Sequence, residues 1–224
     1  MGAEPVKEGC GLPDCGCGER VMIIGITGGS GCGKTTLLDI IRQQGGVVLD
    51  CDAIYHELLR RDDALLGAIS DRFPGVVTDG VLNRKKLGGI VFADEQALLD
   101  LNRITHSAVK KEVLRRLDGF SGLAAIDAIG LFEGGLAELC DVTVAVTAPE
   151  EDRIRRLMIR DSISEEYARK RISAQHSEAW FREKCDDCLA NDGQMDAFAT
   201  KCLAFLERLR IIEEKRKGAN NYDH

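Results

Sequence analysis

The sequence predicts an α/β fold, in which helices flank a parallel β-sheet, from three observations. Apolar runs recur along the chain and are apolar on both faces, as in strands that helices cover on both sides. The segments between these runs, such as TTLLDIIRQQ and RIRRLMIRD, have the apolar spacing of helices. A glycine-rich segment directly follows the first run. The four runs are VMIIGIT at 21–27, GGVVLDCD at 45–52, LAAIDAI at 123–129 and DVTVAVT at 141–147.

The glycine-rich segment GGSGCGKTT has the full pattern of a phosphate-binding loop, Gly-x-x-x-x-Gly-Lys-Thr, between a predicted strand and a predicted helix. Glycines let successive amide N–H groups curl around a phosphate, and the following helix adds the positive end of its dipole. Lys34 is expected to reach the outer phosphates, and the Thr35 hydroxyl to ligate Mg²⁺. We therefore expect ATP and Mg²⁺ as ligands and a sheet of the P-loop NTPase type. The loop residues are Gly28, Gly29, Ser30, Gly31, Cys32, Gly33, Lys34, Thr35 and Thr36.

The chain pattern separates a core domain from several accessory segments. Residues 1–20 are rich in Cys and Gly and are predicted to form a flexible tail, ahead of a P-loop domain over 21–211. Within it, residues 53–122 are too long for a simple crossover, so we expect an inserted helical lobe. The chain ends in one predicted helix, MDAFATKCLAFLERLRIIEEKRK, which carries Phe198, Cys202, Phe205, Leu206 and Leu209 on one stripe. The polar residues GANNYDH after it are expected to fray, and the domain division assigns 212–224 to this polar tail.

Composition limits the classes of protein. The 224 residues are 44% hydrophobic and 30% charged, and no apolar run approaches the ~20 residues of a membrane-spanning helix. The first twenty residues lack the apolar core of a signal peptide, so we expect a cytoplasmic protein without a membrane partner. The net charge of −7 argues against nucleic-acid binding. Oligomeric state is left open between a monomer and a small homo-oligomer.

Nine cysteines are spread along the chain, and we interpret them as free thiols. Cys32 lies at a helix N-terminus, where a thiol either acquires a lowered pKa and oxidises readily or stays inert; the inert state is favoured. The alternative for others is a metal site from the cysteines at 10, 15, 17, 185 and 188, whose spacing fits no strong zinc signature.

Carboxylates follow two of the predicted strands. Asp50 and Asp52 end the second strand and Asp127 lies near the end of the third, and ligands of open parallel sheets collect at these carboxyl ends. One carboxylate can orient or deprotonate an attacking hydroxyl, while another holds magnesium through water. The alternative is that one of the first pair caps a helix starting near Ala53. Glu133 is either a hydrogen-bond acceptor for substrate or a surface acid.

Arginines cluster after the fourth strand. Arg153, Arg156 and Arg160 are spaced three and four apart and share a helix face. A phosphoryl-transfer enzyme needs cations that neutralise charge and a segment that excludes water. We expect a lid over residues 150–180, with Arg156, Arg160, Arg169 and Arg171 as candidates. For any single arginine, the alternative is a solvated face paired with neighbouring acids.

Taken in order, these motifs resemble the dephospho-CoA kinases. These P-loop kinases phosphorylate the ribose 3′-hydroxyl of dephospho-CoA with ATP, in the last step of coenzyme A synthesis. The resemblance covers about residues 22–209. It is carried by IGITGGSGCGKTT, VVLDCD, LNRITHSAV, DAIGLFEGGL, RLMIRDSISEEYARKRISAQ and the turn ANDG at 190–193.

The resemblance implies roles for single residues. Asp52 would be the base facing the 3′-hydroxyl, and Arg160 would close from the lid. Asn191 would belong to the adenine-side turn and His106 to the dephospho-CoA lobe. The roles expected of the remaining acids are metal binding by Asp50 and Asp127, together with Thr35, and substrate binding by Glu133.

Two departures from the family pattern fall on the acceptor side. Ser107 stands where the family usually has Pro, and Ile129-Gly130 replaces its Pro-Leu. Two alternatives therefore stay open: a kinase of another nucleotide-like acceptor, and a non-catalytic ATP-binding module that responds to redox state or metal. Acceptor-dependent ATP turnover would separate a kinase from such a module.

Overall fold

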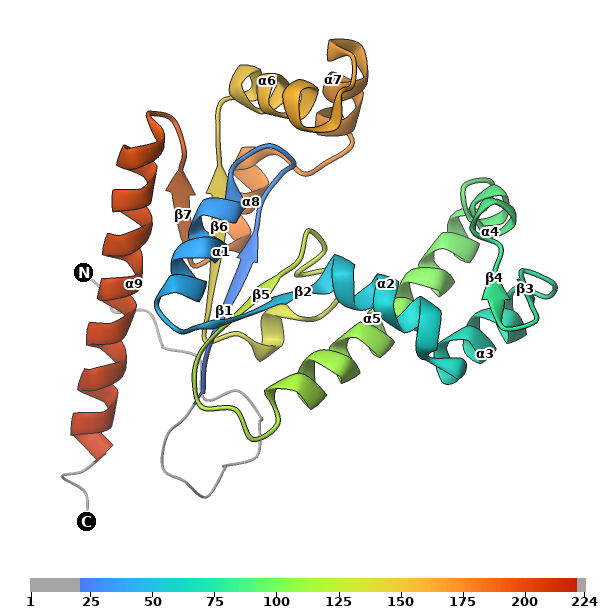
Figure 1. Ribbon diagram of the computed structural model, residues 1–224, viewed down its shortest axis with the longest axis horizontal. Coiled ribbons are helices and arrows are strands. Elements are labelled where there is room, and N and C mark those ends of the chain that lie inside the picture. Colours follow the sequence, from blue (N-terminus) through green and yellow to red (C-terminus); the bar gives the residue numbers. More distant parts are fainter. Residues whose placement is uncertain (1–20, 221–224) are drawn as a thin grey trace. The chain divides into compact units, whose positions relative to one another are not determined.

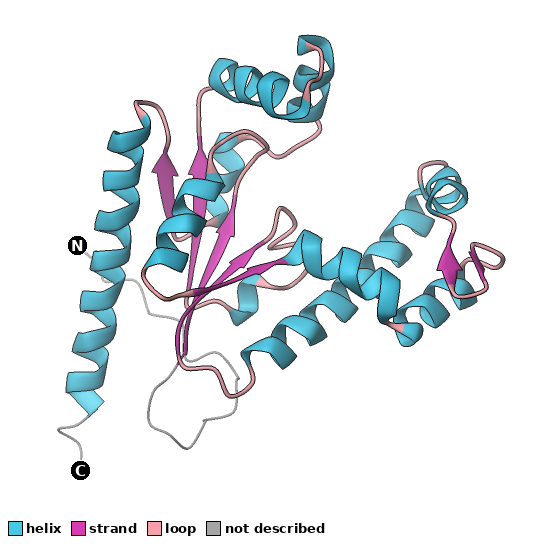
Figure 2. Cartoon of the chain, viewed as in Figure 1, coloured by secondary structure: helices cyan, strands magenta, loops and turns pink. Residues whose placement is uncertain are grey.

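A five-stranded, mostly parallel β-sheet is the main feature of the chain (Figures 1 and 2). The structure is a computed structural model and describes residues 21–220. The strand order is β2-β5-β1-β6-β7, so the α/β fold predicted from the apolar runs is confirmed. The strands are β1 Val21–Thr27, β2 Val47–Asp50, β5 Gly122–Asp127, β6 Val142–Thr147 and β7 Asp187–Ala190, and a separate hairpin comprises β3 Val77–Thr78 and β4 Val81–Leu82.

Helices alternate with these strands along the chain, which is the βα pattern of a parallel sheet. The helices are α1 Lys34–Gln43, α2 Cys51–Arg61, α3 Asp63–Arg72, α4 Arg84–Val91, α5 Glu95–Leu117, α6 Glu150–Asp161, α7 Glu165–Ser173, α8 Glu178–Lys184 and α9 Met195–Asn220, with a 3₁₀ turn, η1, at Ala137–Leu139. Among the described residues, no helix combines the length and apolar character that a membrane span requires.

The chain divides into two compact units, each described by itself below. The first unit comprises residues 1–25 and 48–141, and the second comprises residues 26–47 and 142–224. The boundary therefore cuts β1 between Gly25 and Ile26. The glycine-rich loop and the arginine segment fall in the second unit, and the acidic strand ends fall in the first.

The first unit contains a helical lobe built around α5. Helices α2, α3 and α4 all contact α5, and β3 pairs antiparallel with β4. Side chains just before three helices cap free backbone N–H groups: Asp62 caps α3, Asn83 caps α4 and Asp94 caps α5. The apolar interior includes Leu58, Ile69, Val76, Val113 and Leu117. These helices occupy most of the interval in which the inserted lobe was expected.

The second unit packs α1 and α9 together and sets α9 against β7. Strand β6 pairs parallel with β7, with Val144 opposite Asp187 and Thr147 opposite Ala190. The stripe predicted on the last helix is buried at all five positions: Phe198, Cys202, Phe205, Leu206 and Leu209. The helix itself continues to Asn220. The helix predicted over 195–217 is therefore present, and it extends into the polar tail as far as Asn220.

Two other expectations differ from the structure. The second strand ends at Asp50 and the third at Asp127, because the residues after them start helix α2 or a turn. The sequence analysis did not predict strand β7, because its four residues, DCLA, are too few to show a strand pattern. The tail predicted at residues 1–20, with its three cysteines, and the last four residues of the chain lie outside the described part.

Candidate active site

The phosphate loop in the second unit joins β1 to α1, and its backbone conformation requires glycine. Gly28, Gly31 and Gly33 have φ values of 136°, 79° and 97°, which side-chain-bearing residues rarely adopt. A Cβ at Gly28 would lie 2.2 Å from the carbonyl oxygen of Val146, and one at Gly33 would lie 2.3 Å from Nδ2 of Asn191. The loop thus has the close backbone packing and left-handed turns of a phosphate cradle.

The carbonyl groups of the loop are bonded to side chains from distant parts of the chain. Arg153 donates from Nε to the Ser30 carbonyl at 3.0 Å. Arg156 donates from Nη1 to the Gly31 carbonyl at 3.1 Å. A trans peptide points its C=O and the next N–H in opposite directions. Because these carbonyls are anchored, the N–H group that follows each of them, including that of Gly31, points away from the anchoring arginine.

Asn191 completes this set of contacts. Its side chain is buried, and Nδ2 donates to the Cys32 carbonyl at 2.9 Å. Its backbone N–H donates to the carbonyl of Thr147 at the end of β6. The residue therefore links the strand edge to the loop, and its bond to the Cys32 carbonyl orients the following N–H of Gly33 away from it.

Gln175, which follows α7, holds the loop through its amide. Oε1 accepts from the Ser30 backbone N–H at 2.9 Å and from Arg153 Nη2 at 3.0 Å, and Nε2 donates to Ser30 Oγ at 2.8 Å. Sequence reasoning missed Gln175 and did not select Arg153 as a site residue. We name Ser30, Arg153 and Gln175 the loop clamp.

Lys34 and Thr35 lie in the first turn of α1. Lys34 donates from Nζ to the Gly28 carbonyl at 2.9 Å, and so spans the mouth of the loop. The Thr35 side chain is exposed and accessible to a metal ion. Cys32 is buried, and burial raises the pKa of its thiol despite the opposing influence of Lys34. The structure thus favours the inert state of this cysteine over an oxidation-prone one.

The other predicted lid arginines make different contacts. Arg160 and Arg171 both pair with Asp161, and hydrogen bonding, chiefly from Arg160, lowers the pKa of Asp161 to about 2. Arg169 pairs with Glu150, Glu151 and Glu165. Of the four candidates, Arg156 is therefore the one that contacts the phosphate loop, while the other three show the pairing with acids that was the alternative.

A second site lies in the first unit, as a cavity of about 230 Å³. Asp52 and Tyr55 from α2, and Asn102 and His106 from α5, all line it. The structure thus brings together Asp52 and His106, which are 54 positions apart in sequence and which the sequence analysis placed on the acceptor side. Tyr55, which sequence reasoning missed, lies one helical turn after Asp52, and burial raises its pKa.

The acidic residues around this cavity have distinct surroundings. Asp50 caps α2, because its Oδ1 accepts from the Ala53 N–H at 2.9 Å. The capping alternative thus holds for Asp50, and Asp52 lies in the first helical turn rather than at the strand end. Burial, and after it the nearby carboxylates of Asp127, Asp50 and Asp52 in that order, together raise the pKa of the Cys51 thiol to about 12. The three carboxylates therefore converge on one region.

Three further expectations concern the same unit. Ile129 and Gly130, where the sequence departs from the family pattern, line the cavity, whereas Ser107 is exposed and does not. Glu133 is exposed, and its Oε2 would lie 3.7 Å from a Cβ at Gly130, so it borders this loop without lining the cavity. Within residues 21–220, no group of three or more His, Cys, Asp or Glu side chains has the geometry of a metal site.

The sequence pattern of one family matches most of the chain. The pattern described as dephospho-CoA kinase matches residues 22–197. The chain belongs to the dephospho-CoA kinase family. A dephospho-CoA kinase of Bacillus thuringiensis subsp. konkukian is 34% identical over 198 residues, covering 86% of this chain and 99% of that protein. A dephospho-CoA kinase of Corynebacterium diphtheriae is 36% identical over 183 residues, covering 79% of this chain and 91% of the relative.

Solved structures share the fold of this chain. The crystal structure of TT1252 from Thermus thermophilus has a TM-score of 0.72 and 32% identity, and the match covers 85% of this chain and 99% of that one. A dephospho-CoA kinase from Campylobacter jejuni has a TM-score of 0.60 at 23% identity, covers 85% of this chain and 98% of its own, and supports the fold. The dephospho-CoA kinase family implies use of ATP, as the phosphate loop predicted.

Proposed function

We propose that the protein transfers the γ-phosphoryl group of ATP to the ribose 3′-hydroxyl of dephospho-CoA, giving coenzyme A and ADP. The observation that carries the proposal is the phosphate loop, whose carbonyls are held by Arg153, Arg156 and Asn191 so that amide groups are left for an anion. Family membership supplies the acceptor, since the curated relatives are named dephospho-CoA kinases.

The donor residues bind and orient ATP. Lys34 exchanges its bond to the Gly28 carbonyl for bonds to the β- and γ-phosphate oxygens, and Thr35 would hold Mg²⁺ through its exposed hydroxyl. Mg²⁺ held there would supply positive charge that neutralises the charge developing on the phosphate oxygens. Asn191 fixes the loop from the adenine side. Mg²⁺ is commonly bound by substrate phosphates together with one or two carboxylates. A Mg²⁺ site therefore does not require a full set of protein ligands.

The acceptor residues orient the 3′-hydroxyl and accept its proton. Asp52 lines the cavity with an exposed carboxylate and serves as the base. His106 contributes a hydrogen bond to the acceptor from the cavity wall, and Glu133 contributes one from the loop that borders the cavity. Asp127 and the second oxygen of Asp50, whose first oxygen caps α2, would hold the metal through water.

The lid residues contribute positive charge and exclude water. Arg156 stabilises the loop and adds charge beside it. Arg160 reaches the transferred group after releasing Asp161, and Arg171 keeps that carboxylate paired when it does. Water exclusion limits wasteful hydrolysis of ATP.

A second candidate function is phosphorylation of another nucleotide-like acceptor, because Ile129 and Gly130 alter the cavity wall itself. The non-catalytic ATP-binding module, in which the cysteine-rich tail would respond to redox state or metal, depends on residues 1–20, which lie outside the described residues. The test is ADP production from Mg·ATP with dephospho-CoA, with adenosine, with AMP or with no acceptor. Strong stimulation by dephospho-CoA alone supports the first function. Preference for another acceptor supports the second, and slow hydrolysis that no acceptor stimulates contradicts both.

A further inference from the structure

The first turn of α4 carries an unusual concentration of positive charge. Residues Arg84, Lys85 and Lys86 follow the cap residue Asn83, and that turn contains no acidic residue. A helix N-terminus carries the positive end of the dipole and favours carboxylates there. Three cations at this end therefore work against helix stability. Such an arrangement becomes favourable when an anion binds between the cations and the helix end.

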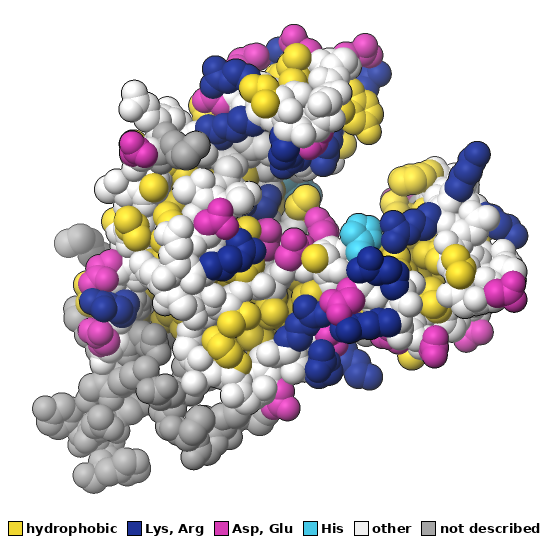
Figure 3. Space-filling model, viewed as in Figure 1, with side chains coloured by type: hydrophobic (Ala, Val, Ile, Leu, Met, Phe, Trp, Pro, Cys, Tyr) yellow, Lys and Arg dark blue, Asp and Glu magenta, His cyan; other side chains and the backbone are white. Residues whose placement is uncertain are grey.

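Arg84 and Arg60 also differ from the other arginines of the described first unit. Neither has an ion-pair partner among the described residues, and both side chains are exposed. The other arginines of the described unit all pair with carboxylates, namely Arg61, Arg72, Arg103, Arg115 and Arg116. The charge of Arg84 and Arg60 is therefore available to a ligand. Figure 3 shows dark-blue cationic side chains beside a histidine over this lobe.

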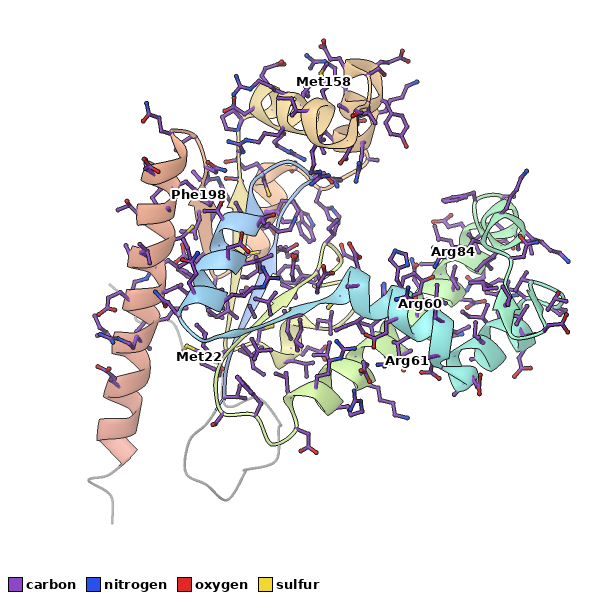
Figure 4. The ribbon with its side chains drawn as sticks, in the orientation of Figure 1. Met22, Arg60, Arg61, Arg84, Met158 and Phe198 are labelled. Carbon is purple, nitrogen blue, oxygen red and sulfur yellow. The ribbon has the colours of Figure 1, made fainter. Side chains whose placement is uncertain are left out.

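These cations are connected to the acceptor cavity through α2. Arg84 Nη2 lies 3.4 Å from Nδ1 of His56, a distance at which Arg84 donates and the imidazole proton resides on Nε2. Asp52, His56 and Arg60 are spaced by four residues, so they lie on one face of α2. The eight residues from Asp52 to Arg60 rise about 12 Å along the helix. Figure 4 labels Arg60 on α2 and Arg84 at the start of α4.

This face of α2 thus begins at Asp52, whose carboxylate lies in the cavity. It ends outside the cavity at Arg60, and Arg84 of α4 lies beside it at His56. An acceptor whose ribose 3′-hydroxyl meets Asp52 has its 5′ substituent on the opposite side of the same ribose. In dephospho-CoA that substituent begins with a diphosphate. Arginine binds phosphate oxygens with paired N–H donors, and the His56 Nε2–H adds a further donor.

We propose that Arg84, with His56 and Arg60, binds the 5′-diphosphate of the acceptor and sets the enzyme's preference for acceptors that carry one. This inference rests on the proposed function, because it takes Asp52 as the residue that meets the 3′-hydroxyl. The residues given this specificity role lie outside the phosphate loop and the lid. Replacing them should therefore weaken the binding of the acceptor and leave the binding of ATP unaffected.

The test compares Arg84→Gln, Arg84→Lys and Arg60→Gln with the wild type in steady-state assays of ADP release. Arg84→Gln is expected to raise the KM for dephospho-CoA at least tenfold, while the KM for ATP and kcat stay within about threefold. Arg60→Gln is expected to raise the same KM by a smaller factor. Arg84→Lys retains the charge but loses the paired donors, so its KM falls between those of wild type and Arg84→Gln.

The matched control is Lys111→Gln. Lys111 is an exposed cation on α5, and the helical period sets it on the face away from Asn102 and His106. An equal rise in KM in Lys111→Gln would reveal a general charge effect and overturn the inference, as would an unchanged KM in Arg84→Gln.

Equilibrium binding of dephospho-CoA by calorimetry separates the two levels of the proposal. Binding by the wild type that Arg84→Gln weakens, without turnover, supports the diphosphate site and contradicts the proposed kinase activity. Turnover with dephospho-CoA that Arg84→Gln leaves unchanged supports the activity and contradicts the diphosphate site. Absence of dephospho-CoA binding to the wild type overturns both.

Discussion

Replacing Gln175 by Ala tests whether the loop clamp sets the affinity for ATP. The substitution removes the acceptor for the Ser30 N–H, the acceptor for Arg153 and the donor to Ser30 Oγ, at distances of 2.9, 3.0 and 2.8 Å. The two bonds to Ser30 contribute about 1 kcal/mol each, and the bond from the guanidinium about 2 kcal/mol. Because Gln175 is only half-buried, water replaces part of the lost contacts, and we expect a net effect of about 2 kcal/mol.

This loss is expected to appear in ATP binding. Without the clamp, the phosphate loop becomes ordered only when ATP binds. The free energy needed to order the loop therefore weakens ATP binding. An effect of about 2 kcal/mol corresponds to a roughly 30-fold rise in the Kd for ATP. Calorimetric titration of the Mg²⁺ complex of a non-hydrolysable ATP analogue measures this Kd, and thermal unfolding checks that the variant remains folded.

Two variants make the result specific. Gln175→Glu keeps an oxygen that accepts from the Ser30 N–H and from Arg153, and Ser30 Oγ can rotate to donate instead, so its Kd should lie within about fivefold of wild type. Gln43→Ala removes an exposed glutamine at the end of α1 and should leave the Kd unchanged. A Kd for Gln175→Ala within twofold of wild type would refute the role of the clamp.

Three further predictions concern the loop, the base and the lobe. Gly33→Ala sets a Cβ 2.3 Å from Asn191 Nδ2 at a φ of 97°, so ATP binding measured by calorimetry should fall at least 100-fold; retained affinity would contradict the cradle. Asp52→Asn should lower kcat by about 10²–10⁴ with ATP affinity retained, whereas Asp71→Asn, an exposed acid on α3, should leave kcat unchanged. The pKa of Glu112 is lowered to about 2, first by hydrogen bonding to Arg115. The ionised carboxylate therefore stabilises the fold at pH values above its unfolded pKa near 4.5. This stabilisation is lost as the pH falls toward 2. Because its partners are partly exposed, we expect Glu112→Gln to cost about 2 kcal/mol at pH 7 and much less near pH 2; a denaturant series that finds the same difference at both pH values would contradict this.

The phosphate loop was predictable from sequence because its constraints are local. Glycine is required at each point where φ is positive, and the lysine and threonine follow at fixed offsets in the first turn of α1. The same holds for the buried stripe of α9, where the helical period alone selects the apolar face. In both cases the sequence pattern and the physical constraint extend over the same few residues.

The partners of the loop were less accessible to sequence reasoning. Gln175 and Asn191 meet Ser30 and Cys32 across 145 and 159 positions of sequence, and a lone Gln carries no local pattern. Arg153 was visible as part of an arginine face, but spacing could not decide which members face the loop and which face neighbouring acids. That choice depends on the packing of α6 and α7, which brings Glu150 and Glu165 to Arg169.

Asp50 and Asp52 show the same limit at shorter range. Both were expected at a strand end, but the strand stops at Asp50, whose side chain then caps α2. The helix begins two residues earlier than expected, and Asp52 faces the cavity from its first turn. The assignment of Asp52 and His106 to the same acceptor site followed from the family resemblance and not from spacing, since 54 positions separate the two residues.

The most direct test of the proposed activity is to follow the phosphoryl group itself. Dephospho-CoA and ATP labelled at the γ-phosphate are incubated with the wild type and with Asp52→Asn, and the product is resolved by chromatography and mass spectrometry. The proposed activity predicts that label appears in coenzyme A at the ribose 3′ position with the wild type, and that this label falls by at least 100-fold with Asp52→Asn. Label that appears only as inorganic phosphate, or transfer to dephospho-CoA that Asp52→Asn leaves intact, would contradict it.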